Sequence, residues 1–294
     1  MSCAGSRVAV IGGRSAIAMQ LRRKFFPEGT YFVRVTPSQG EREVRDYRAI
    51  AAPDLATFDV VINCAGVTAG SESELRRANV ELPLALAHAA REAGASTFVH
   101  ISSFSVYGRE EVISQRTATQ PVCAYGRSKL AADEALLALE CPGFRPVIVR
   151  FPAVIDPDRR KGKVRLLISV LRRIRYIPLP TRDVRRSMIS SSLSARVLAD
   201  LVQASESKLV LAADPQPFTY RQVIQAIRGR EGAKLARAIL MPEIVFSPLA
   251  LAAPSLHRSL FTDSLLEPGS NFAMGYPSDL YKTIEDMATG LGRS

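Results

Sequence analysis

The chain has few residues of the kinds that hold metals or disulfides. Its four cysteines and three histidines are scattered without metal-ligand or redox spacing, and the cysteines form no disulfide framework. These absences argue against a metal site and against a secreted disulfide scaffold, and they favour a reducing, cytoplasmic location. The residues are Cys3, Cys64, Cys123, Cys141, His88, His100 and His257.

Long apolar runs are also missing. The most apolar late stretch, residues 238–254, is interrupted by Pro242, Glu243 and Pro248, and is too broken to span a bilayer. The first apolar strand begins near Val8, which leaves little room for a signal peptide before it. We therefore expect a soluble protein without a membrane span.

Acidic residues are nearly absent from residues 159–186, where eleven lysines and arginines are accompanied by one acid, Asp183. This local surplus of ten nearly equals the net charge of the whole chain, +11. Such a segment could contact nucleic acid, an anionic membrane surface or a small polyanionic substrate. A solvated basic helix would show the same pattern.

Short apolar segments alternate with helical patterns, which predicts an α/β fold with a doubly wound parallel sheet. Apolar side chains at helical spacing predict helices, and prolines follow one of them at Pro178 and Pro180. Beyond Asp214 the chain is helical and punctuated by prolines, as expected of a small cap domain. The expected helices are 72–92, 125–140, 164–175 and 193–204, and the expected strands are 7–11, 31–35, 42–46, 58–63, 97–101, 145–151, 187–190 and 208–211, the last two as a return to the main sheet.

The turn after the first strand has one glycine where a dinucleotide-binding turn usually has three. Gly12 is in place, whereas Ser15 and Ala18 occupy the other two positions. A tight turn that opens a helix still directs backbone N–H groups and the helix dipole at a pyrophosphate. We therefore expect cofactor contacts from Gly12, Arg14, Ser15, Ala16 and Ile17.

An acid that would bind the adenosine ribose of NAD is missing at the end of the second strand, where Thr36 stands with Arg34 nearby. This absence favours NADP weakly over NAD. The small residues after the fourth expected strand would let the cofactor pass close to the backbone. Further expected cofactor contacts are Arg34, Thr36, Glu43, Val44, Cys64, Ala65, Gly66 and Phe151.

Tyr125 and Lys129 are four residues apart in a helical pattern, so they lie on one helix face. An ammonium beside a phenol favours tyrosinate and would lower the pKa of Tyr125. Ser103 follows a buried strand and should point into the crevice where open α/β sheets bind ligands. The three residues together predict proton transfer to or from an alcohol or ketone oxygen.

The combined pattern resembles the extended short-chain dehydrogenase/reductase superfamily, in particular its nucleotide-sugar epimerase/dehydratase/reductase branch. The resemblance covers nearly the whole chain and follows the order of the family's motifs. The residues that carry it are Gly12, Cys64-Ala65-Gly66, Asn79-Val80, Ser102-Ser103, Val106-Tyr107-Gly108, Tyr125, Lys129, Arg150-Phe151-Pro152-Ala153-Val154, Arg185-Arg186-Ser187 and Met274-Gly275-Tyr276-Pro277.

The resemblance implies a role for each matching residue. Tyr125 would be the catalytic acid/base, Lys129 would bind the nicotinamide ribose, and Ser103 would hydrogen-bond the reacting oxygen. Ser103, Phe104 and Arg186 would contact the substrate, Arg186 at its pyrophosphate. Phe104-Ser105 replaces the Asp-Glu pair of the 4,6-dehydratases, which argues against dehydration.

The resemblance also implies a Rossmann domain and a smaller, mostly helical substrate domain. Residues 1–155 and 187–212 would bind the dinucleotide, and residues 156–186 and 213–294 the substrate. By analogy with such enzymes, helices 72–92 and 125–140 would form a homodimer interface.

We expect an NAD(P)-dependent oxidoreductase that acts at C4 of a nucleoside-diphosphate sugar, with 4-ketoreductase slightly preferred over UDP-sugar 4-epimerase. Two alternatives remain. One is an NADP-dependent reductase of a non-sugar ketone. The other is a non-catalytic nucleotide sensor or nucleic-acid-binding protein, which the intact Ser103, Tyr125 and Lys129 make less favourable.

Overall fold

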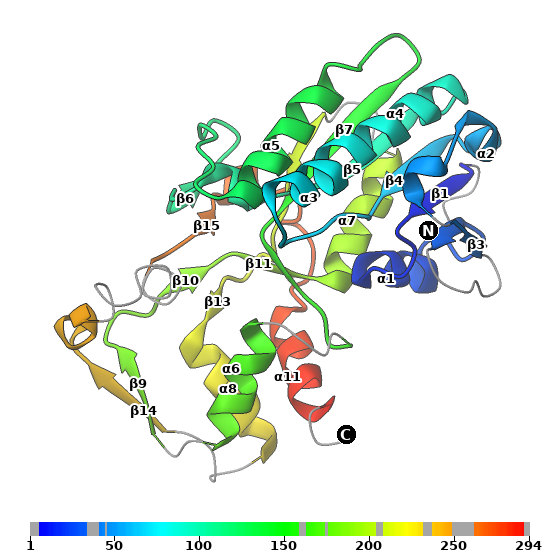
Figure 1. Cartoon of the computed structure of the whole chain (residues 1–294). Coiled ribbons are helices and arrows are strands. Elements are labelled where there is room, and N and C mark those ends of the chain that lie inside the picture. The colour runs from blue at the N-terminus through cyan, green and yellow to red at the C-terminus, as the bar shows by residue number, and fades with distance from the viewer. Residues whose placement is uncertain are drawn as a thin grey trace.

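The computed structural model describes residues 6–33, 41–44, 46–158, 163–173, 176–203, 208–231, 237–248 and 262–290. A seven-stranded parallel sheet forms the centre of the larger body (Figure 1). The strand order reverses between β1 and β4, which is where doubly wound sheets bind ligands. In spatial order the strands are β3 (Glu41–Glu43), β2 (Thr30–Val33), β1 (Val8–Ile11), β4 (Val60–Asn63), β5 (Thr97–Ser103), β7 (Arg145–Phe151) and β12 (Leu209–Leu211).

Apart from the charged edge strand β3, the sheet is buried on both faces, as its continuous apolar strands require. In β1 the side chains of Val8 and Val10 enter one hydrophobic cluster, and those of Ala9 and Ile11 enter another. Alternate residues of a strand point to opposite faces, so these clusters are the cores on the two sides of the sheet. Packing in these two cores fixes the carboxyl ends of the strands, where the candidate site lies.

Helices cover both faces (Figure 1). One core contains side chains from α1 (Ala16–Lys24) and α7 (Ser191–Gln203), and the other contains side chains from α2 (Ala52–Leu55), α4 (Leu82–Glu92) and α5 (Ala124–Leu137). The helix predicted over residues 72–92 is confirmed. It consists of α3 (Glu72–Arg76), a π turn labelled η2 (Arg77–Glu81) and α4.

A separate core lies in a smaller, helical body formed by α6 (Lys163–Arg173), α8 (Tyr220–Glu231) and α11 (Leu280–Gly290). These helices lie together below the sheet in Figure 1. Short strands surround them or connect them to the larger body: β8 (Ala153–Ile155), β9 (Tyr176–Pro180), β10 (Arg185–Arg186), β11 (Met188–Ser190), β13 (Phe218–Thr219) and β14 (Arg237–Met241). The remaining elements are η1 (Tyr47–Ala49), η3 (Phe104–Tyr107), β6 (Val112–Ile113), η5 (Glu243–Phe246), β15 (Leu265–Leu266) and η6 (Pro268–Ser270).

Several expected elements differ from the structure. The strand near residues 187–190 does not return to the main sheet, because β11 pairs with β8 in a two-stranded sheet of its own. Only β12 returns, beside β7. Pro178 and Pro180, expected only to end a helix, lie within β9, which pairs with β14. β3 is shorter than expected and ends at Glu43.

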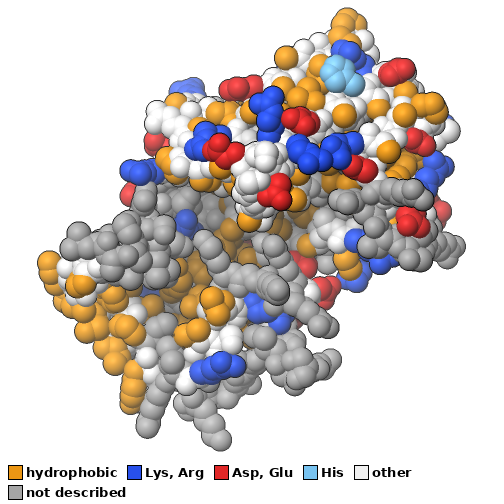
Figure 2. Space-filling model, in the orientation of Figure 1, with side chains coloured by type: hydrophobic (Ala, Val, Ile, Leu, Met, Phe, Trp, Pro, Cys, Tyr) orange, Lys and Arg blue, Asp and Glu red, His pale blue; other side chains and the backbone are white. Residues whose placement is uncertain are grey.

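Hydrophobic side chains gather on the surface over β9 and β14 (Figure 2). Ile239 and Leu240 are consecutive residues of β14, yet each is 48% exposed. Consecutive strand residues point to opposite sides, so this two-stranded unit is partly exposed on both. Among the residues that the structure describes, no helix is both long and apolar enough to cross a bilayer.

Candidate active site

The glycine-containing turn after β1 is packed tightly against the turn after β4. Gly12 has a φ of +79°, and a Cβ atom on it would lie 2.8 Å from the backbone nitrogen of Ala65. Its N–H and that of Gly13 both donate to the Phe32 carbonyl, over 3.2 and 3.0 Å. Glycine is therefore required at position 12 for two reasons: its backbone conformation and the close approach of two turns.

The N-terminus of α1 follows this turn. Ser15 is the N-cap, and its hydroxyl accepts a hydrogen bond from the Ala18 N–H over 3.3 Å. The N–H groups of Ala16 and Ile17, in the first helical turn, have no carbonyl partner within the helix. Together with the helix dipole, they suit a pyrophosphate, so the serine in place of the second glycine preserves an anion site.

The turn after β4 is shaped by Asn63, which is completely buried. Its side-chain oxygen accepts from the Ala65 N–H over 3.0 Å, and its amide nitrogen lies 3.2 Å from Nδ1 of the buried His100. Burial raises the pKa of the Cys64 thiol to about 12, and a hydrogen bond with Ser15 opposes the rise. Cys64 therefore stays a neutral thiol beside the expected cofactor path.

Asn79 anchors the segment that follows Gly66. It lies in the π turn η2 and is fully buried. Its amide accepts from the Val67 N–H and donates to the Val67 carbonyl, both over 2.9 Å, and it also donates to Ser128 Oγ over 3.1 Å. The π turn thus joins the β4 turn to α5, in line with the frequent occurrence of such turns at functional sites.

Ser103 and Tyr125 are brought together as expected. Ser103 is the last residue of β5, and Tyr125 lies in the first turn of α5. Both side chains are half-buried, and the Ser103 hydroxyl is close enough to the Tyr125 phenol to lower its pKa. Ser103 Oγ also lies 3.2 Å from both the backbone nitrogen and the hydroxyl of Ser105. A hydroxyl and a phenol therefore converge at the carboxyl edge of the sheet.

The expected lowering of the Tyr125 pKa by Lys129 was wrong. Burial raises the pKa of Tyr125, and the hydrogen bond with Ser103 opposes that rise only in part. Lys129 is buried and donates from Nζ to the Ile101 carbonyl over 2.8 Å, which fixes its ammonium behind the strand end. Desolvation lowers the pKa of Lys129 to about 8, although the nearby Asp133 opposes this effect.

Lys129 lies next to the turn after β4 as well. A Cβ atom on Gly66 would come within 3.6 Å of Lys129 Nζ and 3.1 Å of the Asn79 side-chain oxygen. The space above Gly66 is therefore bounded by an ammonium and an amide. This arrangement fits the ribose hydroxyls of a nicotinamide nucleotide, and it makes Gly66 the residue that keeps the space open.

The sequence interpretation missed a buried polar network behind these residues. Asp133 Oδ2 accepts from Ser102 Oγ and from Arg150 Nε, each over 2.9 Å, and Arg150 also donates to the Tyr107 hydroxyl over 2.9 Å. The signal was present, because Asp133 follows Lys129 by four residues and so lies on the same helix face. The network ties β5, α5 and β7 together.

Other expected site residues have varied placements. Phe151 is buried at the end of β7, in register with Ser103. The ring of Phe104 is 8% exposed and packs in a hydrophobic cluster, so substrate contact by this residue stays a prediction. Arg186 donates from Nη1 to the Thr262 carbonyl over 3.2 Å, and its substrate contact is likewise untested.

Two residues expected to contact the adenosine part of the cofactor lie in or next to β3. Glu43 is exposed and Val44 is half-buried. Arg14 is ion-paired with Glu41. Arg34 and Thr36 lie outside the described residues. No group of three or more potential metal ligands occurs among the residues with described positions.

Comparisons with known proteins agree with this geometry. The sequence profile of the NAD dependent epimerase/dehydratase family matches residues 10–185. The dTDP-6-deoxy-L-talose 4-dehydrogenase (NAD(P)(+)) of Kitasatospora kifunensis is 31% identical over 229 residues, which cover 72% of this chain and 71% of that protein. The 4-hydroxy-2-methyl-3-oxo-4-farnesyl-3,4-dihydroquinoline-1-oxide ketoreductase of Stigmatella aurantiaca is 23% identical over 201 residues, which cover 64% and 59%.

Among solved structures, the UDP-N-acetylglucosamine 4-epimerase of Methanobrevibacter ruminantium M1, in complex with UDP-N-acetylmuramic acid, superposes with a TM-score of 0.77. The two chains are 14% identical, and the match covers 100% of each. At that identity the likeness shows the fold, which is the Rossmann sheet with a smaller C-terminal part. Because the family profile matches more than half of the chain, the protein belongs to the NAD dependent epimerase/dehydratase family and is an enzyme of the extended short-chain dehydrogenase/reductase type.

Proposed function

We propose that the protein is an NAD(P)-dependent oxidoreductase that reduces a ketone at C4 of a nucleoside-diphosphate sugar. The observation that carries this proposal is that Ser103, at the carboxyl end of β5, acts on the phenol of Tyr125 in the first turn of α5, with the Lys129 ammonium one helical turn behind. The relative from Kitasatospora kifunensis, whose name gives a 4-dehydrogenase of a dTDP-sugar, supports the choice of position and substrate class.

The described residues fit a nicotinamide dinucleotide. The Gly12 turn and the N–H groups of Ala16 and Ile17 would hold the pyrophosphate, and Lys129 would bind the ribose beside Gly66. When bound, the nicotinamide supplies the hydride. The turns at Gly12 and Gly66 leave room for it because neither has a side chain.

The protein's own part in the reaction is to bind and protonate the carbonyl oxygen. Ser103 donates a hydrogen bond to that oxygen and polarises it, and Tyr125 transfers its proton as negative charge develops. Burial raises the pKa of Tyr125, so the phenol keeps its proton at neutral pH. A protonated phenol is the form that reduction needs.

Epimerisation at C4 is the second candidate, and the fold of the Methanobrevibacter ruminantium enzyme makes it relevant. The same residues would serve, but Tyr125 would first have to accept a proton from a sugar hydroxyl. We place reduction first because the relative from Kitasatospora kifunensis, at 31% identity, is named as a 4-dehydrogenase, whereas the epimerase structure is 14% identical to this chain.

The test offers the purified protein a dTDP- or UDP-4-keto-6-deoxy sugar with NADH or NADPH and follows nicotinamide absorbance. We expect oxidation of the nicotinamide with wild-type protein and its loss in Tyr125→Phe. Tyr176→Phe, which removes a hydroxyl from a side chain that is 49% exposed, is the matched control and should stay active. Inversion of UDP-glucose or UDP-N-acetylglucosamine without added cofactor, and no ketone reduction, would establish the epimerase instead.

Reduction of a non-sugar ketone is a third candidate, because the relative from Stigmatella aurantiaca is named as a quinoline-oxide ketoreductase. Arg186 discriminates between the two substrate classes. If Arg186 binds a substrate pyrophosphate, as we propose, Arg186→Ala should raise KM for the sugar nucleotide strongly and change kcat little. A non-sugar ketone reductase would keep its KM in this variant.

The proposal extends to the organisation of the chain. Residues 156–186 and 213–294 would bind the sugar nucleotide, and residues 1–155 and 187–212 the dinucleotide. The helices 72–92 and 125–140 would pair with those of a second copy. Light scattering of the purified protein would test the homodimer.

A further inference from the structure

The two-stranded unit of β9 and β14, together with the turn η5 that follows it, has an exposed apolar surface (Figure 2). Tyr176 in β9 is 49% exposed, and Ile239 and Leu240 in β14 are each 48% exposed. In η5, Ile244 is 76% exposed and Val245 is 46% exposed. We call these five residues the apolar patch. Large hydrophobic side chains that gather in one exposed place indicate an interaction site.

The apolar patch is not one flat face. Ile239 and Leu240 are consecutive in β14, so their side chains leave the strand on opposite sides. Pro178, which is in register with Ile239 on the neighbouring strand, is exposed as well. The unit lies at an outer edge of the molecule (Figure 1). A medium that surrounds such a unit would bury more of its apolar surface than a partner that covers one side of it.

Arginines flank the apolar patch in the chain. Arg173 is the last residue of α6, just before β9, and Arg182 follows β9; both are exposed. They belong to the segment of residues 159–186, which has a surplus of ten positive charges. Two acids nearby, Glu243 and Asp263, are each paired with Arg182, over 3.5 and 3.1 Å. The patch therefore lies beside the most basic segment of the chain.

We propose that the apolar patch docks on a membrane surface that contains anionic lipid. Its aliphatic side chains would enter the boundary between headgroups and acyl chains, and Tyr176 is of the type that favours the headgroup level. The flanking arginines would pair with lipid phosphates. Docking of this kind needs no spanning segment. The inference goes beyond the proposed reaction and does not require it.

A second copy of this chain fits the apolar patch less well. A two-fold interface pairs a surface with itself, so the basic segment of one copy would face the same segment of the other. Like charges brought together in this way repel. Anionic headgroups instead complement the arginines, which is the reason to choose lipid as the occupant.

Co-sedimentation of the full chain with lipid vesicles tests the proposal. One preparation contains phosphatidylcholine alone, and the other contains equal parts of phosphatidylcholine and phosphatidylglycerol. We expect binding to the mixed vesicles and at least about tenfold weaker binding to phosphatidylcholine alone, because several arginines lose their anionic partners. Binding to the mixed vesicles should weaken as the salt concentration rises.

A variant of the most exposed residue of the patch tests the apolar contribution. Ile244→Glu should weaken binding to the mixed vesicles at least about tenfold, because a side chain that would enter the lipid becomes charged. Val112→Glu is the matched control, since Val112 is 60% exposed in β6, apart from the patch. It should bind the vesicles as wild-type protein does. Both positions are exposed, so both variants should fold.

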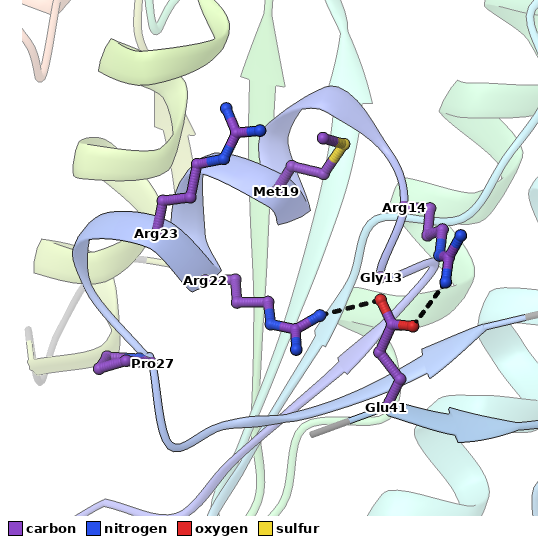
Figure 3. A pocket seen from close by; sticks show the side chains of 7 residues that line it. All are labelled: Gly13, Arg14, Met19, Arg22, Arg23, Pro27 and Glu41. Carbon is purple, nitrogen blue, oxygen red and sulfur yellow. Dashed lines mark hydrogen bonds and ion pairs between the residues drawn. The ribbon is translucent and has the colours of Figure 1, made fainter. Parts of the chain in front are cut away.

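A variant of a flanking arginine tests the electrostatic contribution. Arg173→Ala should weaken binding to the mixed vesicles about fivefold and change binding to phosphatidylcholine little. Arg23→Ala is the matched control, because it removes an exposed arginine from α1 in the larger body. Arg23 follows Arg22, which pairs with Glu41 beside the glycine-containing turn (Figure 3). This variant should leave vesicle binding unchanged.

Three results would overturn the proposal. The first is the absence of binding to the mixed vesicles. The second is binding that Ile244→Glu and Arg173→Ala leave unchanged, since lipid would then contact another surface. The third is a dimer, seen by light scattering, that Ile244→Glu separates, because a second copy would then cover the patch. None of these measurements depends on turnover, so vesicle binding without reduction of any sugar nucleotide would uphold the docking surface and remove the proposed reaction.

Discussion

Arg150 and Asp133 form a buried ion pair, with Arg150 Nε 2.9 Å from Asp133 Oδ2 and side chains 7% and 1% exposed. The pair joins β7 to α5 directly behind Lys129, and Ser102, next to Ser103, donates to the same carboxylate oxygen. Burial raises the pKa of Asp133, and the Arg150 charge opposes that rise. The helix α5 is thus fixed to two strands of the sheet by one carboxylate.

Removing that carboxylate should be costly. Breaking a buried pair leaves a buried charge without compensation, so Asp133→Ala should lower the free energy of unfolding by about 3–5 kcal/mol. Denaturant titration measures the loss. Glu81→Ala, which breaks the exposed pair between Arg76 and Glu81, should cost less than about 1 kcal/mol. Equal losses in the two variants would contradict the role given to Asp133.

Two effects make glycine necessary at position 12: its left-handed backbone and the close approach of Ala65. A comparison with Gly94 separates them. Gly12 and Gly94 have φ angles of +79° and +83°, but a Cβ atom on Gly94 would meet nothing within 4 Å. Gly94→Ala should therefore cost only about 1–2 kcal/mol, the strain of a left-handed alanine. Gly12→Ala should cost more and should abolish NADH binding, because its Cβ atom would lie 2.8 Å from the Ala65 nitrogen.

Calorimetry of unfolding and a fluorescence titration with NADH measure both effects. Intact NADH binding in Gly12→Ala would show that the two turns can separate without harm. Equal destabilisation of the two variants would assign the whole effect to the backbone angle.

The buried ammonium of Lys129 predicts a pH-dependent stability. Its pKa is lowered from 10.5 to about 8 in the folded protein, so between these values the unfolded chain binds more protons than the folded one. Stability should then rise with pH relative to a variant that lacks the group. From about pH 7 to about pH 10, wild type should gain about 2–3 kcal/mol over Lys129→Met.

Parallel denaturant titrations of the two proteins across this range check the trend. Lys208→Met removes an ammonium whose side chain is 58% exposed, and it tests whether loss of any lysine has the same effect. A constant difference between wild type and Lys129→Met would show that Lys129 keeps an ordinary pKa when folded.

Asn79 should matter for cofactor binding through the backbone that it holds. Asn79→Ala removes both bonds to Val67 and the bond to Ser128, and should lower the free energy of unfolding by about 1–3 kcal/mol. Because Val67 follows Gly66, the dissociation constant for NADH should rise as well. Asn271→Ala is the matched control, since Asn271 makes the same two bonds with Ala213.

Unfolding and NADH titration of both variants give the comparison. We expect similar losses of stability and a weaker complex with NADH only for Asn79→Ala. A loss of NADH affinity in Asn271→Ala of the same size would mean that general loosening, and not the Val67 segment, is responsible.

Much of the fold could be predicted because its determinants are local. Each parallel strand except the charged edge strand β3 is a short apolar run, and alternation with helical patterns indicates the layer order. Ser103 and Tyr125 could be paired in advance because one ends a strand and the other begins the next long helix. Their spatial meeting follows from the topology of the sheet, which brings strand ends and helix starts to one edge.

The unpredicted features depend on contacts between distant residues. Glu41 is 27 residues from Arg14 and 19 from Arg22, and no spacing rule connects them. The raised pKa of Tyr125 follows from burial, which a motif does not report. The Lys129 ammonium is directed to the Ile101 carbonyl, and only the packing of α5 against β5 decides that.

The position of β12 has a consequence for attempts to divide the chain. Leu209–Leu211 pairs with Ile148–Arg150 of β7, although the helices α6 and α7 and the strands β8 to β11 lie between them in sequence. A fragment that stopped near residue 158 would leave one side of β7 with unpaired amides and carbonyls along an apolar strand. An unpaired apolar edge strand of this kind pairs with strands of other molecules. The isolated N-terminal half should therefore aggregate.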